Sequence, residues 1–137
     1  MQETLMMIKP DAVERGLTGK ILAHAQEAGL EIVRLRMVKL SEAEARQFYA
    51  VHEGKPFLDE LVTFMSRSPV VAAVGRHPEA VALWRTTMGA TNPADAEAGT
   101  IRKLHATSIG ENAVHGSDSP ENAATEIAFF GMGLELR

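Results

Sequence analysis

Runs of apolar residues along the chain predict four strands. Residues 4–8 (TLMMI) form an apolar run that stops at a Lys-Pro-Asp sequence, which is typical of a buried strand. Residues 31–40 (EIVRLRMVKL) alternate apolar and charged side chains with one phase slip, and this pattern predicts a half-buried strand. Residues 69–75 (PVVAAVG) are apolar and β-branched, as expected of a central strand. A last strand is predicted at residues 128–130 (AFF), with Gly131 as its exit.

Helical spacing and capping residues separate these strands. Ser41 and Glu44 have the spacing of a capping box, and Thr18 is a second candidate for a helix cap. Pro78 and Pro120 fit the first turn of a helix, because this turn leaves its N–H groups unpaired and proline has none. The predicted helices cover residues 18–28, 41–51, 57–65, 78–88 and 119–127.

The order of these elements predicts an α/β sandwich of the split βαβ type, with helices packed on the sheet. A chain of 137 residues suits one domain, residues 1–137, around one core. Residues 89–100 (GATNPADAEAGT) are rich in Gly, Asn, Pro and Ala and predict a long loop, a kind of segment that often carries function. The stretch around His105 is expected to be irregular.

Composition narrows the class of protein. The net charge of −4 disfavours a nucleic-acid partner bound through overall charge, so an anionic ligand would need a local cluster of Lys and Arg. The absence of cysteine excludes disulfides, thiolate metal sites and cysteine nucleophiles. No apolar run approaches the roughly 20 residues of a membrane span, and the N-terminus lacks the pattern of a signal peptide. We therefore expect a cytoplasmic protein with no membrane partner.

The common nucleotide-binding motifs are missing. Residues 18–21 (TGKI) resemble the end of a phosphate loop, but Glu14 stands in place of its first glycine and Ile21 follows the lysine. The sequence has neither a G-x-G-x-x-G motif after a strand nor a G-x-S-x-G motif. A nucleotide-binding function would need another kind of site.

His115, in the segment NAVHGSDSPEN, has several possible roles. One imidazole and one nearby carboxylate give weak support for a metal site. Ser117 and Ser119 lie too close in sequence to act as the serine of a hydrolytic triad and are better suited to orienting or capping. A turn that leads into a capped helix explains the segment without any chemistry, and on spacing alone it is the favoured interpretation.

The remaining role for His115 is that of a nucleophile. An imidazole is largely neutral at pH 7, so one ring nitrogen can attack while the other donates its proton to a fixed acceptor. Gly116 and Ser117 are small enough to leave room for a phosphate. The carboxylates that could hold the ring are Asp118, Glu121 and Glu126.

Five separated blocks of the sequence resemble the nucleoside diphosphate kinases. NAVHGSDS resembles the active-site signature of this family. The other blocks, in the order and spacing of the family, are LMMIKPDAVERGLTGKIL, YAVHEGKPFLDELVTFM, SPVVAAVG and WRTTMGATNPADAEAGTIR. Together they span essentially the whole chain, so a chance match is not credible.

The resemblance implies a fold and an activity. The implied fold is a ferredoxin-like α/β sandwich, in which helices cover an antiparallel four-stranded sheet. The implied activity is Mg²⁺-dependent transfer of the γ-phosphate of a nucleoside triphosphate, typically ATP, to a nucleoside diphosphate, with broad base and sugar specificity. The transfer is ping-pong through a phosphohistidine, and His115 matches the phosphorylated histidine. Glu126 matches the carboxylate that orients it, and Ser117 matches the hydroxyl beside it.

The resemblance also implies the residues that line the nucleotide pocket. They are Lys9, Tyr49, His52, Phe57, Leu61, Arg85, Thr91, Arg102, Ile109 and Asn112. Lys9 and Tyr49 count among the catalytic groups as well. No protein ligand to the metal is implied, because the Mg²⁺ is held mainly through the nucleotide phosphates.

Physical chemistry agrees with these assignments. Arg85, Arg102 and Thr91 would hold the β- and γ-phosphates together with Mg²⁺, since guanidinium groups suit bidentate contact with phosphate oxygens. By resemblance, Lys9 and Asn112 contact the ribose hydroxyls and the side of the sugar nearest the phosphates. 

Phe57 would stack on the base, and stacking tolerates any base. Core packing is the alternative role for the apolar pocket residues. It has more weight for Leu61 and Ile109 than for Phe57, which follows the polar sequence HEGKP.

Some features depart from the usual family pattern. Ala98 stands where many members have proline, and residues 103–108 (KLHATS) differ from the commoner acidic and aromatic sequence. The short C-terminus (GMGLELR) resembles bacterial members, in which this segment contributes to subunit contacts. We expect a homo-oligomer, with a tetramer or dimer favoured over a hexamer.

Three other functions are kept as alternatives. One is a regulatory module that binds nucleotides without turnover, although the intact set of His115, Lys9, Arg85 and Arg102 argues against it. The second is a nucleic-acid-binding protein, which the net charge of −4 and the absence of a long basic stripe disfavour. The third is a histidine phosphatase, which would use water as the phosphate acceptor.

Overall fold

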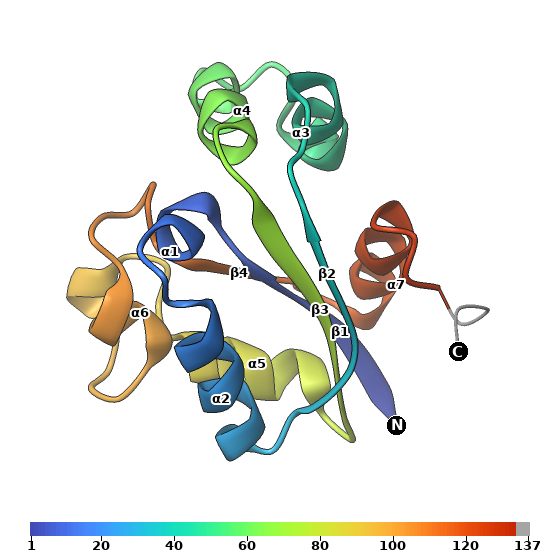
Figure 1. Ribbon diagram of the computed structural model, residues 1–137, viewed down its shortest axis with the longest axis vertical. Helices are drawn as coiled ribbons and strands as arrows, with labels where there is room; N and C mark the ends of the chain where they lie inside the picture. The colour runs from blue at the N-terminus through green and yellow to red at the C-terminus, as the bar shows by residue number, and fades with distance from the viewer. Residues whose placement is uncertain (134–137) are drawn as a thin grey trace.

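The computed structural model describes residues 1–133, so the end of the short C-terminus, residues 134–137, lies outside the described residues. The chain forms a four-stranded antiparallel sheet in the order β2-β3-β1-β4 (Figure 1). The strands are β1 (Gln2–Ile8), β2 (Glu31–Val38), β3 (Val70–His77) and β4 (Val114–Gly116). The helices are α1 (Pro10–Glu14), α2 (Thr18–Ala28), α3 (Glu42–Phe48), α4 (Leu58–Ser66), α5 (Ala80–Met88), α6 (Ile101–His105) and α7 (Pro120–Phe129). Single 3₁₀ turns cover Ala50–His52 and Pro93–Asp95. This is the predicted ferredoxin-like α/β sandwich.

Two hydrophobic cores lie on opposite faces of the sheet. The side chains of β1 alternate between them, because neighbouring residues of a strand point to opposite faces. Leu5 and Met7 belong to the core that α3, α4 and α7 cover, whereas Met6 and Ile8 belong to the core that α1, α2, α5 and α6 cover. Both faces are therefore buried, which explains why residues 4–8 read as a continuous apolar run.

The predicted phase slip and two predicted caps are confirmed. The pairing of β2 with β3 shifts register between Ile32 and Arg34. The Ser41 hydroxyl accepts from the Glu44 N–H at 3.0 Å, and the Glu44 carboxylate accepts from the Ser41 N–H at 2.9 Å. Ser119 caps α7, with Pro120 as the first residue of the helix.

The prediction of a last strand at residues 128–130 is wrong. Ala128 and Phe129 end α7, and Phe130 is its C-cap with a buried ring. An apolar run of three residues has no period that could distinguish a strand from a helix end. The fourth strand is instead β4, which contains His115 and pairs with β1.

Smaller differences concern helix starts. Leu17, not Thr18, is the N-cap of α2, and no side chain caps this helix. Pro78 precedes the Glu79 cap of α5 and so lies outside that helix. The stretch around His105 was expected to be irregular but contains α6, whose five residues are too few for helical periodicity to be visible.

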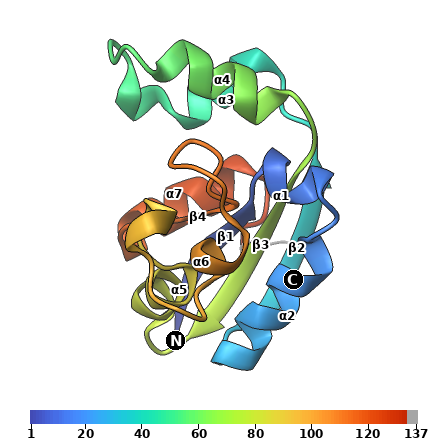
Figure 2. The same cartoon turned by 90° about the vertical axis from the view of Figure 1, so that its left-hand side faces the viewer.

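The helical hairpin of α3 and α4 projects from one end of the sandwich. It lies at the top of both views, beyond the ends of the strands (Figures 1 and 2). No helix within residues 1–133 has the length and apolar character needed to span a membrane.

Candidate active site

The fold places His115 in β4, opposite Met7 of β1. Val114 belongs to the core on the α5 side, so the alternation along β4 directs His115 to the face covered by α3, α4 and α7. There the imidazole meets the edge of the Phe48 ring, with ring centroids 5.5 Å apart. The side chain is partly buried and is anchored through its backbone, because the Trp84 indole N–H donates to the His115 carbonyl at 3.2 Å.

Helix α7 brings Glu126 to the imidazole. Glu126 Oε1 lies 3.2 Å from His115 Nε2 and also accepts from the Ser117 hydroxyl at 2.7 Å. The two other candidate carboxylates point elsewhere. Asp118 accepts from the Asn122 side chain, and Glu121 is exposed in the first turn of α7. The structure thus brings together the three residues that the family resemblance grouped as His115, Glu126 and Ser117.

Gly116 is small for a different reason from the predicted one. A Cβ atom at this position would lie 2.5 Å from Trp84 Cδ1 and 2.7 Å from Met88 Cε. The missing side chain therefore leaves room for the buried indole that anchors His115 rather than for a phosphate.

Two buried polar side chains, those of Lys9 and Asn112, meet next to β4. Lys9 Nζ donates to Asn112 Oδ1 at 2.9 Å, and the Asn112 amide donates to the Thr91 carbonyl at 3.3 Å. The pKa of Lys9 is lowered to about 8, mainly by burial and also by the Arg102 charge, while the Asp11 carboxylate opposes the change. A bound anionic ligand would stabilise the charged form of this lysine and raise its pKa again.

The two predicted phosphate-binding arginines differ in their surroundings. Arg102 is buried and donates to the carbonyls of Gly89 and Val114, each at 2.9 Å. It thereby ties the start of the 89–100 loop to β4. Arg85 is exposed on α5, with one contact to the Asp118 carbonyl at 3.2 Å, so its guanidinium is available to a ligand.

Aromatic side chains connect His115 to the hairpin. The Tyr49 ring meets the imidazole edge at 6.2 Å and stacks on His52 at 6.1 Å, and His52 meets Phe57 at 5.1 Å. The Tyr49 hydroxyl is buried without a partner in residues 1–133, and burial together with the Glu126 charge raises its pKa.

The three apolar residues predicted to line the pocket are not equivalent. Phe57 is 46% exposed and Ile109 is 58% exposed, so neither serves core packing. Leu61 is partly buried and packs against the core, as its alternative role required.

Sequence reasoning missed three residues around His115. Phe48 and Trp84 contact it, and Asp11 binds the backbone two residues before it. Asp11 could have been noticed in the sequence Lys-Pro-Asp, and Phe48 and Trp84 as the neighbours of Tyr49 and Arg85. None of the three carries a spacing signal of its own.

No group of three or more His, Cys, Asp or Glu side chains that could hold a metal ion occurs within residues 1–133. The donors near His115 are a lysine, two arginines and amide groups, which suit phosphate oxygens. The fold and site therefore define an α/β sandwich protein in which a carboxylate-backed histidine lies among groups suited to an anionic ligand.

Comparisons with known proteins identify the family. The family model for nucleoside diphosphate kinase matches residues 2–134. The chain is 55% identical over 136 residues to a nucleoside diphosphate kinase of Persephonella marina, covering 99% of this chain and 97% of the relative. It is 57% identical over 136 residues to one of Cereibacter sphaeroides, again covering 99% and 97%. The chain belongs to the nucleoside diphosphate kinase family, and it is an enzyme of the phosphotransferase class.

Solved structures agree with the sequence relatives. The nucleoside diphosphate kinase of Aquifex aeolicus superposes with a TM-score of 0.94 at 43% identity, covering 98% of this chain and 97% of that one. The enzyme of Encephalitozoon cuniculi superposes with a TM-score of 0.91 at 37% identity, covering 95% and 88%. These matches confirm the predicted fold.

Proposed function

We propose that residues 1–137 form one nucleoside diphosphate kinase domain that works through a phosphohistidine on His115. The contact of His115 with Glu126 carries this proposal. An ionised carboxylate can only accept hydrogen bonds, so the imidazole N–H that meets Glu126 Oε1 is the one on Nε2. Nδ1 then has a free lone pair and is the nucleophile.

The first half-reaction is a substitution at the γ-phosphorus of a nucleoside triphosphate such as ATP. A bond forms between Nδ1 and phosphorus, and the bond to the oxygen shared with the β-phosphate breaks, so that the nucleoside diphosphate leaves. Glu126 stabilises the positive charge that develops on the ring, and Ser117 holds Glu126 in place. In the second half-reaction, a nucleoside diphosphate attacks the phosphohistidine and the same bonds form and break in reverse.

The charged groups around His115 support phosphate binding. Lys9, Arg85 and Arg102 would compensate the charge of the phosphates, and the neutral Thr91 hydroxyl would donate a hydrogen bond to them. Charge compensation and placement are most of what phosphoryl transfer requires of a protein. Lys9 and Asn112 would also contact the ribose, and the buried Tyr49 hydroxyl would donate near the transferred phosphate. His52 would contact the nucleotide from the hairpin.

Nucleotide kinases use a divalent metal ion, and we propose Mg²⁺. This hard cation prefers oxygen ligands and commonly binds through substrate phosphates rather than through an all-protein site. The lysine and arginine side chains around His115 would bind phosphate oxygens, so the metal would be held by the nucleotide phosphates rather than by protein ligands. When bound, Mg²⁺ would neutralise charge on the β- and γ-phosphates.

The exposed apolar side chains support recognition of the base. Phe57 would stack on one face of any base, with Ile109 as a further apolar contact. Leu61 packs against the core and would help to hold the hairpin segment that carries Phe57. Because stacking reads no hydrogen-bond pattern, we expect broad base specificity, with ATP and other nucleoside di- and triphosphates as partners. We place this activity in the cytoplasm and expect neither a membrane nor a nucleic-acid partner.

The edge of the described sheet supports a homo-oligomer. Strand β2 lies at this edge and exposes Leu35 and Met37, each more than half accessible. An apolar edge strand is a template for pairing with another chain. We propose a dimer or a tetramer, which the molar mass from light scattering tests.

The activity is tested by incubating the protein with γ-labelled ATP and Mg²⁺ and then adding GDP. We expect acid-labile, alkali-stable label on the protein that GDP discharges as GTP, and no label on the His115→Ala variant. Label that persists after GDP, or that forms on His115→Ala, would contradict the proposal. Affinity without label would indicate a regulatory module, and release of inorganic phosphate without GTP would indicate a phosphatase.

A further inference from the structure

The backbone just before His115 is strained at Ala113. This residue has a φ of +74°, and it is the only non-glycine residue within residues 1–133 in the left-handed region. The N–H of Val114 donates to the carbonyl of Asn112 at 2.9 Å. A hydrogen bond between residues two apart, around a central residue with this φ, is a γ-turn of the rare and strained kind rather than the inverse kind.

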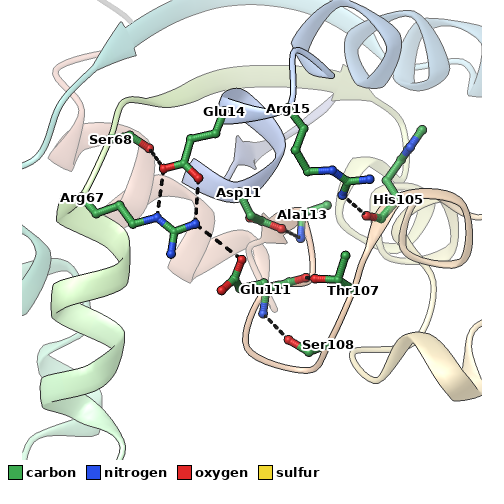
Figure 3. Close-up of polar contacts among 10 residues, drawn as sticks. All are labelled: Asp11, Glu14, Arg15, Arg67, Ser68, His105, Thr107, Ser108, Glu111 and Ala113. Carbon is green, nitrogen blue, oxygen red and sulfur yellow. Dashed lines mark hydrogen bonds and ion pairs between the residues drawn. The ribbon is translucent and has the colours of Figure 1, made fainter.

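Backbone strain of this sort destabilises the chain and persists only where the surroundings enforce it. Here the enforcing contacts come from the end of β1 and the start of α1. The Ala113 N–H donates to Asp11 Oδ2 at 3.1 Å, as Figure 3 shows, and the Ala113 carbonyl accepts from the Lys9 N–H at 2.8 Å. Asp11 is only 3% exposed, and its burial raises the pKa of its carboxyl.

The turn lies between two residues that meet different parts of a nucleotide. On one side Asn112 binds Lys9, on the proposed ribose side, and on the other side β4 leads to His115. The turn therefore sets the distance between the group that holds the sugar and the group that attacks phosphorus. An error of about 1 Å in such a distance can cost about 10²-fold in rate.

We propose that Asp11 is a positioning residue, which keeps the γ-turn at Ala113 closed and so fixes His115 relative to the sugar-binding Asn112. This role rests on the proposed function, because it presumes that His115 is the nucleophile. Without the Asp11 carboxylate, the Ala113 N–H is buried and unpaired, and the strained φ has lost one of its supports. The turn then relaxes, and the His115 imidazole is no longer held at a fixed distance from the bound nucleotide.

A simpler role is stability alone, because Asp11 and Ala113 are both buried. The two roles differ in what a glycine at position 113 does. Glycine adopts a positive φ without the Cβ penalty, so it relieves the strain that Asp11 otherwise holds. It does not replace a lost hydrogen bond.

The experiment measures the single-turnover rate of label transfer from γ-labelled ATP to His115, by rapid quench, together with unfolding by denaturant. The set is the unchanged chain, Asp11→Ala, Asp11→Asn, Ala113→Gly and the double variant Asp11→Ala/Ala113→Gly. Ser66→Ala is the matched control, because it removes a buried hydrogen bond, from the Ser66 hydroxyl to the Val62 carbonyl, away from the site.

We expect Asp11→Ala to slow labelling by about 10- to 100-fold, with a smaller change in the affinity for ATP. Asp11→Asn retains an oxygen acceptor and keeps the rate within about fivefold. The slowing caused by Asp11→Ala is about tenfold smaller in the Ala113→Gly background. The double variant is therefore compared with Ala113→Gly, and Asp11→Ala is compared with the unchanged chain. Ser66→Ala lowers stability without changing the rate.

Labelling rates that match the unchanged chain in all variants, with only stability reduced, would overturn the positioning role. The positioning role would also be overturned if Ala113→Gly did not reduce the loss of labelling rate caused by Asp11→Ala. If the unchanged chain takes no label, the proposed function fails first and this role with it. If Asp11→Ala does not fold, Ala113→Val replaces it, since a β-branched residue strains the turn further and should slow labelling while Ala113→Gly does not.

Discussion

The strand that carries His115 and the hairpin that carries Phe57 are built in opposite ways. β4 has only three residues, but its backbone is bound by β1, Trp84 and Arg102. The hairpin of α3 and α4 projects from the sandwich (Figure 2) and exposes 82% of Val51 as well as nearly half of Phe57. Attack at phosphorus needs one fixed geometry, whereas a base can be gripped by a surface that adjusts.

The contrast extends to how each region is stabilised. Around β4 the polar groups are buried, so each lost partner leaves an unpaired group in a dry environment. On the hairpin, polar contacts such as the pair Arg46–Asp59 are exposed and contribute little to stability. Changes near β4 should therefore affect rate and stability together, whereas changes at the exposed positions of the hairpin should leave stability unchanged and affect affinity at most.

The largest expected effect comes from Glu126→Gln. An amide can present its NH₂ to the imidazole and so favour the tautomer with the proton on Nδ1, which removes the nucleophilic lone pair. We expect kcat to fall about 10²-fold with little change in KM, measured by a coupled assay with ATP and a nucleoside diphosphate. Glu121→Gln, on the exposed first turn of the same helix, is the control and should leave kcat unchanged. Equal effects of the two substitutions would contradict the assignment.

Next in size is Gly116→Ala, which tests whether β4 is as rigid as its contacts imply. The added methyl group would overlap the Trp84 indole, so either the ring or β4 must move. We expect the free energy of unfolding to fall by about 1–3 kcal/mol, measured by urea denaturation, with a parallel loss of kcat. Gly110→Ala is the control, because a Cβ there meets no atom within 4 Å. If Gly116→Ala were as stable and active as the unchanged chain, β4 and the Trp84 ring could move without cost, and the prediction of a rigid β4 would be wrong.

Much of the fold was predictable from the sequence because strands buried on both faces and capped helices leave local signals. The run at residues 4–8 and the capping box at Ser41 are such signals. β4 left none, since three residues are too few for a period and their pairing with β1 joins positions far apart in the chain. The same limit misplaced the last strand at residues 128–130.

The residues around His115 were predictable mainly through the family resemblance. Their physical reasons were harder to foresee, as Gly116 shows, because its partner Trp84 lies in a different element. The left-handed conformation of Ala113 was also invisible, since alanine has no preference for a positive φ. Tertiary contacts decide such features, and a single sequence does not record them.

A smaller effect is expected from Phe57→Ala on the hairpin. Removal of the ring should weaken the binding of ADP and GDP by a similar factor, about tenfold, because stacking contributes about 1–3 kcal/mol for any base. Unfolding free energy should change by less than about 0.5 kcal/mol, since nearly half of Phe57 is exposed and it belongs to neither core. Val51→Ala, at the more exposed position, should change neither quantity. Calorimetric binding of the two nucleotides measures the affinity, and a marked loss of stability would place Phe57 in the core instead.

The smallest expected effect is a pH dependence caused by Lys9, which lies beside β4 and binds Asn112. In the free enzyme its pKa is lowered to about 8, mainly by burial, so the lysine loses its charge as the pH rises past this value. If the charged form of Lys9 binds the nucleotide, as we propose, affinity for ADP should fall by up to about eightfold between pH 7.5 and pH 9, which follows from the change in the protonated fraction. Lys9→Met should bind weakly at both pH values and lose this dependence.

The contribution of Lys9 to the free energy of unfolding should change with pH in the opposite direction to the affinity for ADP. This opposite sign identifies Lys9 as the group that titrates. Between about pH 8 and the ordinary lysine value of 10.5, the unfolded chain holds more protons at Lys9 than the folded chain does. The contribution of Lys9 to the free energy of unfolding therefore rises with pH across this window, and it is lost as the pH falls through about 8. Urea denaturation at several pH values, compared with Lys9→Met, measures this difference. If affinity and the Lys9 contribution to stability decline together as the pH rises, the alkaline loss reflects unfolding near β4 rather than deprotonation of Lys9.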